Sequence, residues 1–190
     1  MSLIIFDWDD TLCPTTWIYD NDLVGSQTPL TKSQHDWLHI CGVHLRSLLS
    51  IAMTHGDVMI LTNSTPGWVS YCVKRYLPTC ENVVERCNVH YAWQSTLPDH
   101  RVWKIEYLRS YFQDSMQYEC VLGVGDMVHD RLAIRTTLLG RCTIKTLKLL
   151  LQPTVEDFIF ELIALIYSFD ALMERGKAYD LVISTTPSCS

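Results

Sequence analysis

The segment LIIFDWDDTL, residues 3–12, leads from an apolar run into three carboxylates, Asp7, Asp9 and Asp10. Carboxylates this close repel one another, and each is costly to remove from water. A fold therefore keeps such a cluster where a cation lies among the acids. Side chains alternate along extended backbone, so Asp7 and Asp9 are expected on one face and Trp8 on the other.

Two further strand-like segments also end in polar residues. VMILTN ends in Thr62 and Asn63, and CVLGVGD brings Asp126, with Asp130 four residues later. In a parallel α/β sheet, ligands bind beyond the carboxyl ends of the strands. We therefore expect these oxygens to form a pocket with Asp7. Such a pocket suits Mg²⁺, which prefers hard oxygen ligands.

Apolar spacing sets the elements that must position these residues. The predicted strands are 3–8, 57–62, 88–93, 120–125, 141–147 and, at an edge, 180–184, and the predicted helices are 33–54, 66–77, 101–113, a short one from 128, and 153–175. Strands that alternate with helices predict an α/β fold with a central parallel sheet. Residues 13–32 are rich in Pro, Thr, Asp and Gly and are expected to form a loop or small flap. A single domain over residues 1–190 is expected, without internal repeats.

Four segments, in chain order, resemble the signature motifs of a known family. They are IIFDWDDTL, VMILTNS, HRVWKIEYL and GVGDMVHD, and they span residues 4 to 130. The resemblance is to the haloacid-dehalogenase-like (HAD) superfamily of Mg²⁺-dependent phosphohydrolases, and it implies a three-layer Rossmann-like fold. The segments FDWDDTLCPTTW, LTNSTPGWV and PTVEDF further resemble a subgroup found mainly in protists and algae, which has no established substrate.

The resemblance implies a role for each matching residue. Asp7 would be the nucleophile that forms an aspartyl-phosphate. Asp9 would be the general acid and base, and its presence argues for phosphate esters over carbon–halogen bonds. Thr62 would hydrogen-bond the phosphoryl oxygens, and Lys104 would offset the charge on Asp7 and on the phosphoryl group. The expected activity is hydrolysis of a phosphomonoester.

The resemblance also implies a metal site. Asp126, the Asp7 carboxylate and the backbone carbonyl of Asp9 would hold Mg²⁺, and Asp130 would tune that shell. The predicted substrate-binding residues are Asn63 and Thr11. The lysine assignment has a rival in Lys74, which comes too early in the motif order.

The intervals between motifs are short for an inserted cap domain. About twenty residues separate Thr11 from the first predicted helix, and roughly forty separate Thr62 from Lys104. The expected protein has no large cap domain and an open site. In the family that arrangement goes with macromolecular substrates or with a lid from another subunit. Trp17 and Tyr19 fit either a small local lid or simple packing of the flap onto the core.

Composition bounds the other partners. The formal charge of −6 disfavours broad binding to nucleic acid, although Lys74, Arg75, Arg101 and Arg131 would suit a nucleic-acid end phosphatase if they gathered at the site. No apolar run reaches the length of a membrane span. The eight cysteines are scattered without a CxxC pair, and the N-terminus shows no basic leader. These features predict a reduced, cytoplasmic protein.

Several features have a plain structural interpretation. Asp10 is expected to be a turn residue that supports its loop. His35 and His39, one helical turn apart, could bind a metal but are expected on a solvated face. His129 fits either contact with substrate or an ordinary loop histidine, and the loop histidine is expected. The apolar stripe of the 154–173 helix fits either core packing or a homodimer surface. A non-catalytic interaction module within a larger assembly is the alternative function.

Overall fold

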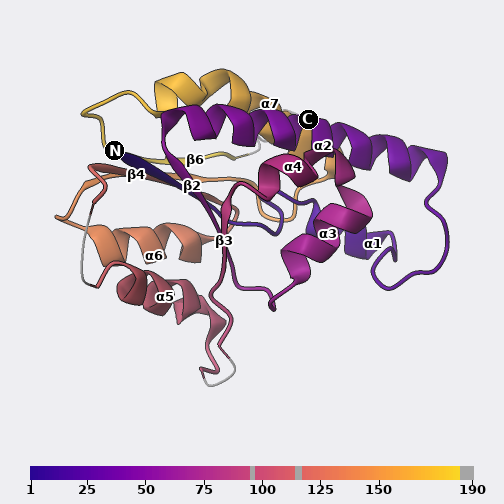
Figure 1. Ribbon diagram of the computed structural model, residues 1–190, viewed down its shortest axis with the longest axis horizontal. Coiled ribbons are helices and arrows are strands. Elements are labelled where there is room, and N and C mark those ends of the chain that lie inside the picture. Colours follow the sequence, from indigo (N-terminus) through magenta and orange to yellow (C-terminus); the bar gives the residue numbers. More distant parts are fainter. Residues whose placement is uncertain (95–96, 114–116, 185–190) are drawn as a thin grey trace, which may run out of the picture.

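The computed structural model describes residues 1–94, 97–113 and 117–184, and it shows an α/β fold around a six-stranded, all-parallel sheet (Figure 1). The strands are β1 (Ser2–Phe6), β2 (Asp57–Thr62), β3 (Asn88–Tyr91), β4 (Cys120–Gly125), β5 (Thr143–Lys148) and β6 (Tyr179–Val182). Their order is β3-β2-β1-β4-β5-β6. The chain runs outward from β1 to β3 and then returns to β4, so the order reverses between β1 and β4. In Rossmann-like sheets this reversal creates the ligand crevice.

Helices cover both faces of the sheet. They are α1 (Thr15–Asp20), α2 (Lys32–His55), α3 (Trp68–Tyr76), α4 (Glu81–Val84), α5 (Trp103–Tyr111), α6 (Val128–Leu138) and α7 (Val155–Leu172), with the 3-10 helices η1 (Pro78–Cys80) and η2 (His100–Val102). Figure 1 shows α2 and α7 together on one face, and α5 and α6 on the other. The expected three-layer arrangement around a parallel sheet is confirmed. No helix of the described residues is long and apolar enough to cross a membrane.

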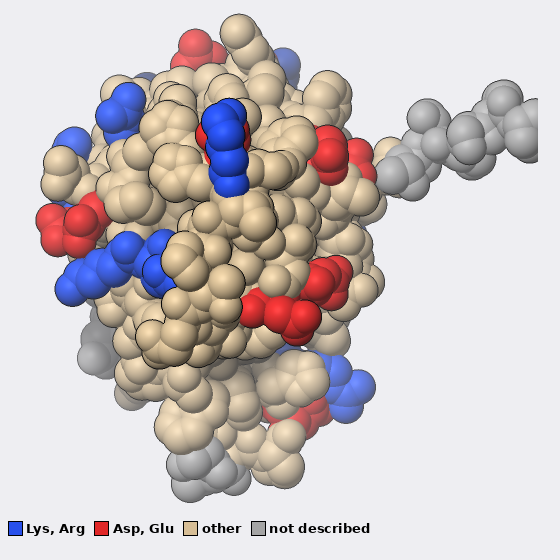
Figure 2. All heavy atoms as spheres, turned by 90° about the vertical axis from the view of Figure 1, so that its right-hand side faces the viewer, with Lys and Arg blue, Asp and Glu red and all other residues tan. Residues whose placement is uncertain are grey.

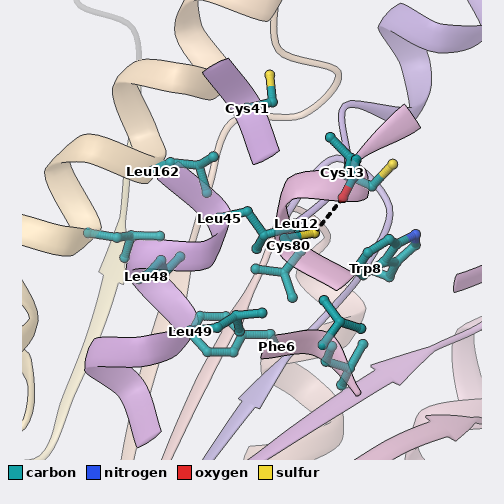
Figure 3. Packing of buried hydrophobic residues seen from close by; sticks show 14 of the residues in the cluster. Phe6, Trp8, Leu12, Cys13, Cys41, Leu45, Leu48, Leu49, Cys80 and Leu162 are labelled. Carbon is teal, nitrogen blue, oxygen red and sulfur yellow. Dashed lines mark hydrogen bonds between the residues drawn. The ribbon is translucent and has the colours of Figure 1, made fainter. Parts of the chain in front are cut away.

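Alternate residues of β1 enter two separate cores. Ile4 and Phe6 pack with α2 and α7, and Figure 3 shows Phe6 near Leu49. Leu3 and Ile5 pack with α5 and α6 on the opposite face. A strand buried on both faces needs a continuous apolar run, which is what residues 3–6 supply.

The expected loop over residues 13–32 is wrong in part, because α1 forms within it. The first turn of α1 is capped from a distance, since the Asp10 carboxylate accepts hydrogen bonds from Thr16 N at 2.8 Å and Thr16 Oγ1 at 2.5 Å. Asp10 reaches this position with a left-handed φ of +52°. The prediction that Asp10 supports its loop is confirmed, but the same contact makes part of that loop helical.

The start of α3 also differs from expectation. Pro66 was predicted to open this helix, but Pro66 lies in the preceding turn and the helix begins at Trp68. Gly67 occupies the N-cap with φ +95°, a conformation that glycine adopts without steric cost.

The predicted last edge strand is confirmed as β6, at the end of the sheet beside β5. Leu181 and Val182 are exposed there, at 45% and 53%. Asp180 fixes the strand, because its carboxylate accepts hydrogen bonds from Arg131, Arg135 and Thr146.

The N-terminus of α7 depends on one side chain. Thr154 Oγ1 accepts a hydrogen bond from Asp157 N at 3.1 Å. We expect Thr154→Ala to lower the free energy of unfolding by about 1 kcal/mol, as other lost caps do. Thr154→Ser keeps the hydroxyl and should stay close to wild type in urea unfolding. Equal losses in both variants would assign the effect to the methyl group instead.

Candidate active site

The ends of β1 and β4 bring three carboxylates together. Asp7 N donates to Val124 O at 2.9 Å, which fixes the turn after β1 beside β4. One oxygen from each of Asp7, Asp126 and Asp130 lies within 4.8 Å of the others. These residues therefore meet at the point where the strand order reverses. Oxygens this close could share one divalent cation.

Lys104 of α5 lies among these carboxylates. Its Nζ donates to Asp7 Oδ1 at 2.5 Å and to Asp130 Oδ1 at 2.6 Å, and the residue is 6% exposed. Burial alone would lower the pKa of Lys104, but the carboxylates of Asp130 and Asp7 outweigh it and raise that pKa. The two carboxylates therefore favour the ammonium form of Lys104. Lys74 is exposed on α3 and lines a different groove.

One ammonium does not balance three carboxylates. Burial raises the pKa of Asp7, and the Lys104 ammonium opposes that rise. Burial, followed by the charge of Asp130, raises the pKa of Asp126 to about 7. Asp126 Oδ1 is also buried without a hydrogen-bond partner among the described residues. An unpartnered buried acceptor and unbalanced charge together fit a second cation at this point.

Gly125 makes room for Asp130. A Cβ at position 125 would lie 2.4 Å from Asp130 Oδ2, which is far inside van der Waals contact. The same oxygen accepts a hydrogen bond from Met127 N at 3.1 Å, and Oδ1 takes Lys104. Asp130 is thus held from both sides next to the other two carboxylates.

The side chain of Asp9 lies outside this group. Four side chains donate to it, namely Thr15 and Trp68 to Oδ1, each at 2.8 Å, and Ser64 and Thr62 to Oδ2, at 2.7 and 3.2 Å. Asp9 nevertheless borders the same cavity as Asp7, although β1 ends at Phe6. The chain then turns at Trp8, whose carbonyl accepts from the following loop. Trp8 itself turns away into the core, as predicted.

The carboxylates line a cavity of about 160 Å³. Asp9, Asp10 and Lys104 also border it, and the remaining lining residues are Asn63, His100, Met127 and His129. Asn63 Nδ2 donates to His100 O at 3.1 Å, so the loop after β2 is tied to η2. Carboxylate, amide, ammonium and imidazole groups therefore all border one cavity.

Two predicted residues lie behind the cavity wall. Thr62 is fully buried, and its hydroxyl donates to Asp9 and accepts from Ser64 N at 3.0 Å. Thr11 is 1% exposed, and its hydroxyl has no hydrogen-bond partner among the described residues. Neither borders the cavity, in contrast to Asn63.

Three residues that hold Asp9 or border the cavity were not predicted from the sequence. Ser64 and Trp68 hold Asp9, and His100 borders the cavity. His129, expected to be an ordinary loop histidine, borders it too, and its ring packs edge-on against His100 with centroids 6.4 Å apart. His100 precedes Lys104 by about one helical turn, and that spacing could have signalled its position.

Comparison of the chain with protein-family models, curated proteins and solved structures found no match.

Proposed function

We propose that this chain is a Mg²⁺-dependent phosphatase of the HAD type, which hydrolyses a phosphomonoester through an aspartyl-phosphate. The observation that supports this most is the convergence of Asp7, Asp126 and Asp130 around the Lys104 ammonium. Phosphoryl transfer needs positioned positive charge more than covalent help from the protein. A nucleophilic carboxylate between a lysine and a metal site meets that need.

The residues present fit Mg²⁺. Asp7 and Asp126 would hold the ion, with the Asp9 backbone carbonyl as a further ligand and Asp130 tuning the site. The orphaned Asp126 Oδ1 is the acceptor that the ion would satisfy. When bound, the ion neutralises the carboxylates and the phosphoryl oxygens.

Each residue around the cavity then has its own role in the reaction. A carboxylate oxygen of Asp7 forms a bond to phosphorus while the ester P–O bond breaks, and Lys104 offsets the charge on Asp7 and on the phosphoryl oxygens. Protonated Asp9 gives its proton to the leaving oxygen. Water then attacks phosphorus while Asp9 takes its proton, and the bond between Asp7 and phosphorus breaks, which releases phosphate and restores the Asp7 carboxylate. To protonate the leaving oxygen, Asp9 must exchange at least one of its four hydrogen bonds for the leaving group. Asn63 is placed to contact the phosphoryl group from the cavity wall.

The test is release of inorganic phosphate from 4-nitrophenyl phosphate with Mg²⁺ and after chelation of the metal. We expect release with Mg²⁺ and its loss on chelation. No release from the wild type at high enzyme concentration would favour the non-catalytic interaction module.

Metal binding should depend on pH through Asp126. In the metal-free protein the pKa of Asp126 is raised from 3.8 to about 7. Between these two pH values the folded state therefore binds more protons than the unfolded state. The Asp126 contribution to stability therefore falls as pH rises from about 4 to 7. Mg²⁺ needs the carboxylate, so its stabilising effect should grow over the same range.

We expect Mg²⁺ to raise the melting temperature more at about pH 8 than at about pH 5.5. Asp126→Asn should lose most of this increment at both pH values. Thermal unfolding with and without Mg²⁺ measures it. Equal increments at both pH values in the wild type would contradict a metal ligand with a raised pKa.

A nucleic-acid end phosphatase finds less support. Arg101 pairs with Asp99 at 2.8 Å, and Arg131 pairs with Asp180 at 2.5 Å, so two of the four candidate basic side chains are neutralised. On the side shown in Figure 2, basic side chains are separate and interspersed with acidic ones. Binding to a nucleic-acid backbone needs several positive charges along one groove.

Other partner expectations stay proposals. A macromolecular substrate fits the open site, because α1, α3 and the short elements between Thr62 and Lys104 form no separate domain in the described residues. A homodimer fits α7, on which Phe160 and Tyr167 are 70% and 87% exposed. The seven described cysteines are free thiols, which fits a reducing, cytoplasmic location.

A further inference from the structure

The two oxygens of the Asp9 carboxylate have chemically different partners. Trp68 Nε1 and the Thr15 hydroxyl donate to Oδ1, each at 2.8 Å. The hydroxyls of Ser64 and Thr62 donate to Oδ2, at 2.7 and 3.2 Å. An indole N–H can only donate a hydrogen bond, whereas a hydroxyl can donate or accept one. Among the described residues that contact this carboxylate through their side chains, Trp68 is therefore the one that cannot reverse its hydrogen bond.

The indole of Trp68 is held in place by its surroundings. The helix α3 begins at Trp68, directly after Gly67 at the N-cap. The rings of Tyr19 and Tyr71 stack on the indole, with centroids 6.1 and 5.6 Å away and interplanar angles of 22° and 24°. The partly buried indole also packs against the core that contains α2 and α7. A side chain locked by packing keeps its N–H directed at one point, as a residue that orients a catalytic group must.

The two oxygens also differ in their position relative to the cavity. The side chains that contact Oδ1 come from α1 and α3, and neither helix contributes a residue to the described cavity lining. The side chains that contact Oδ2 come from Thr62 and Ser64, the neighbours in sequence of Asn63. Asn63 borders the cavity. Oδ2 therefore lies on the side of the loop that forms part of the cavity wall.

The following step rests on the proposed function. As general acid, Asp9 must carry a proton on one oxygen and bring that oxygen to the leaving group. A proton on Oδ1 would compete with the fixed indole N–H of Trp68 for the same oxygen. A proton on Oδ2 meets hydroxyls alone, and these can turn to accept it. The hydrogen bonds of Oδ2 therefore suit both the protonated and the ionised state of Asp9.

We propose that Trp68 is a positioning residue, whose N–H reserves Oδ1 of Asp9 so that Oδ2 carries the proton to the leaving oxygen. As Asp7 bonds to phosphorus and the ester P–O bond breaks, the proton passes from Oδ2 to the departing oxygen. The leaving oxygen takes the place of the Ser64 hydroxyl, because Ser64 is partly exposed whereas Thr62 is fully buried. Trp68 itself does not touch the substrate.

The dependence of the rate on the leaving group tests this role. Phenolate needs a proton to leave, whereas 2,4-dinitrophenolate leaves without one. The measured quantity is kcat/KM for 2,4-dinitrophenyl phosphate divided by kcat/KM for phenyl phosphate, with Mg²⁺ present. Trp68→Phe keeps a ring but removes the N–H, and it should raise this ratio about three- to tenfold, the size expected for one hydrogen bond. Asp9→Asn, which removes the proton donor, should raise it further.

Two more variants make the test specific. Trp93→Phe changes an exposed tryptophan and should leave the ratio as in the wild type. Ser64→Ala should raise the ratio by less than about twofold, because the leaving oxygen replaces that hydrogen bond. A rise of about threefold or more in Ser64→Ala would overturn the assignment of the proton to Oδ2, whether or not Trp68→Phe folds.

The remaining outcomes separate this proposal from the phosphatase proposal. Thermal unfolding shows whether Trp68→Phe is folded. A folded Trp68→Phe protein that hydrolyses both esters with the wild-type ratio, even at lower rates, would show that the indole has a structural role alone. That result would overturn the positioning role while the phosphatase proposal stands. Absence of phosphate release from both esters in the wild type would instead refute the phosphatase proposal, and the role of Trp68 with it.

Discussion

Replacement of Asp7 by Asn is expected to abolish phosphate release, with a loss in kcat of roughly 10⁴-fold or more. Asn has the shape of Asp, and its carbonyl oxygen can still accept from Lys104 Nζ. The amide does not supply an anionic oxygen to attack phosphorus. The variant should therefore fold and lose the chemical step alone. Phosphate release from 4-nitrophenyl phosphate with Mg²⁺ measures the effect.

The matched control is Asp36→Asn on α2, which removes an exposed carboxylate that pairs with Lys32. It should leave the rate unchanged. Wild type and Asp7→Asn with equal rates would show that any observed hydrolysis comes from elsewhere, and the interaction-module alternative would gain support. Thermal unfolding of each variant separates loss of chemistry from loss of fold.

Lys104→Met should give the largest effect on stability. The side chain is buried and pairs with Asp7 and Asp130, so its removal leaves buried carboxylates without their ammonium partner. Breaking a buried pair in this way costs about 3–5 kcal/mol. Mg²⁺ should restore part of the loss, because it supplies positive charge to the same carboxylates. Phosphate release should fall strongly even when the protein is folded.

Urea unfolding with and without Mg²⁺ measures this effect. The control is Lys74→Met, on the exposed face of α3, which should change the free energy of unfolding by no more than about 0.5 kcal/mol. Two results would contradict the shared role of lysine and metal in balancing the carboxylates. One is a similar loss in the free energy of unfolding in both variants, and the other is a Lys104→Met protein whose free energy of unfolding does not change with Mg²⁺.

The convergence at the strand ends could be predicted because it follows from two strong signals. Buried parallel strands appear as continuous apolar runs, and the carboxyl ends of such strands meet at one edge of the sheet. Asp7 and Asp126 each follow such a run directly. Lys104 lies 97 residues from Asp7 in sequence, and only the order of the motifs pointed to it.

The conformation of Asp9 could not be predicted in this way. Its donors Thr62, Ser64 and Trp68 lie 53 to 59 residues away in sequence. The sequence around Asp9 contains no pattern that predicts these hydrogen bonds. The helix α1 was missed for a related reason, since its cap comes from Asp10 with a left-handed backbone.

The position of β6 has a consequence for the behaviour of the protein in concentrated solution. A terminal strand offers unpaired amide groups as a template, and neighbouring molecules can add to it and aggregate. Leu181 and Val182 make this template attractive, whereas Asp180 places a charge within it that two arginines hold in position. The Asp180 carboxylate thus places an acidic group in the terminal strand, and charged groups within edge strands oppose intermolecular sheet growth.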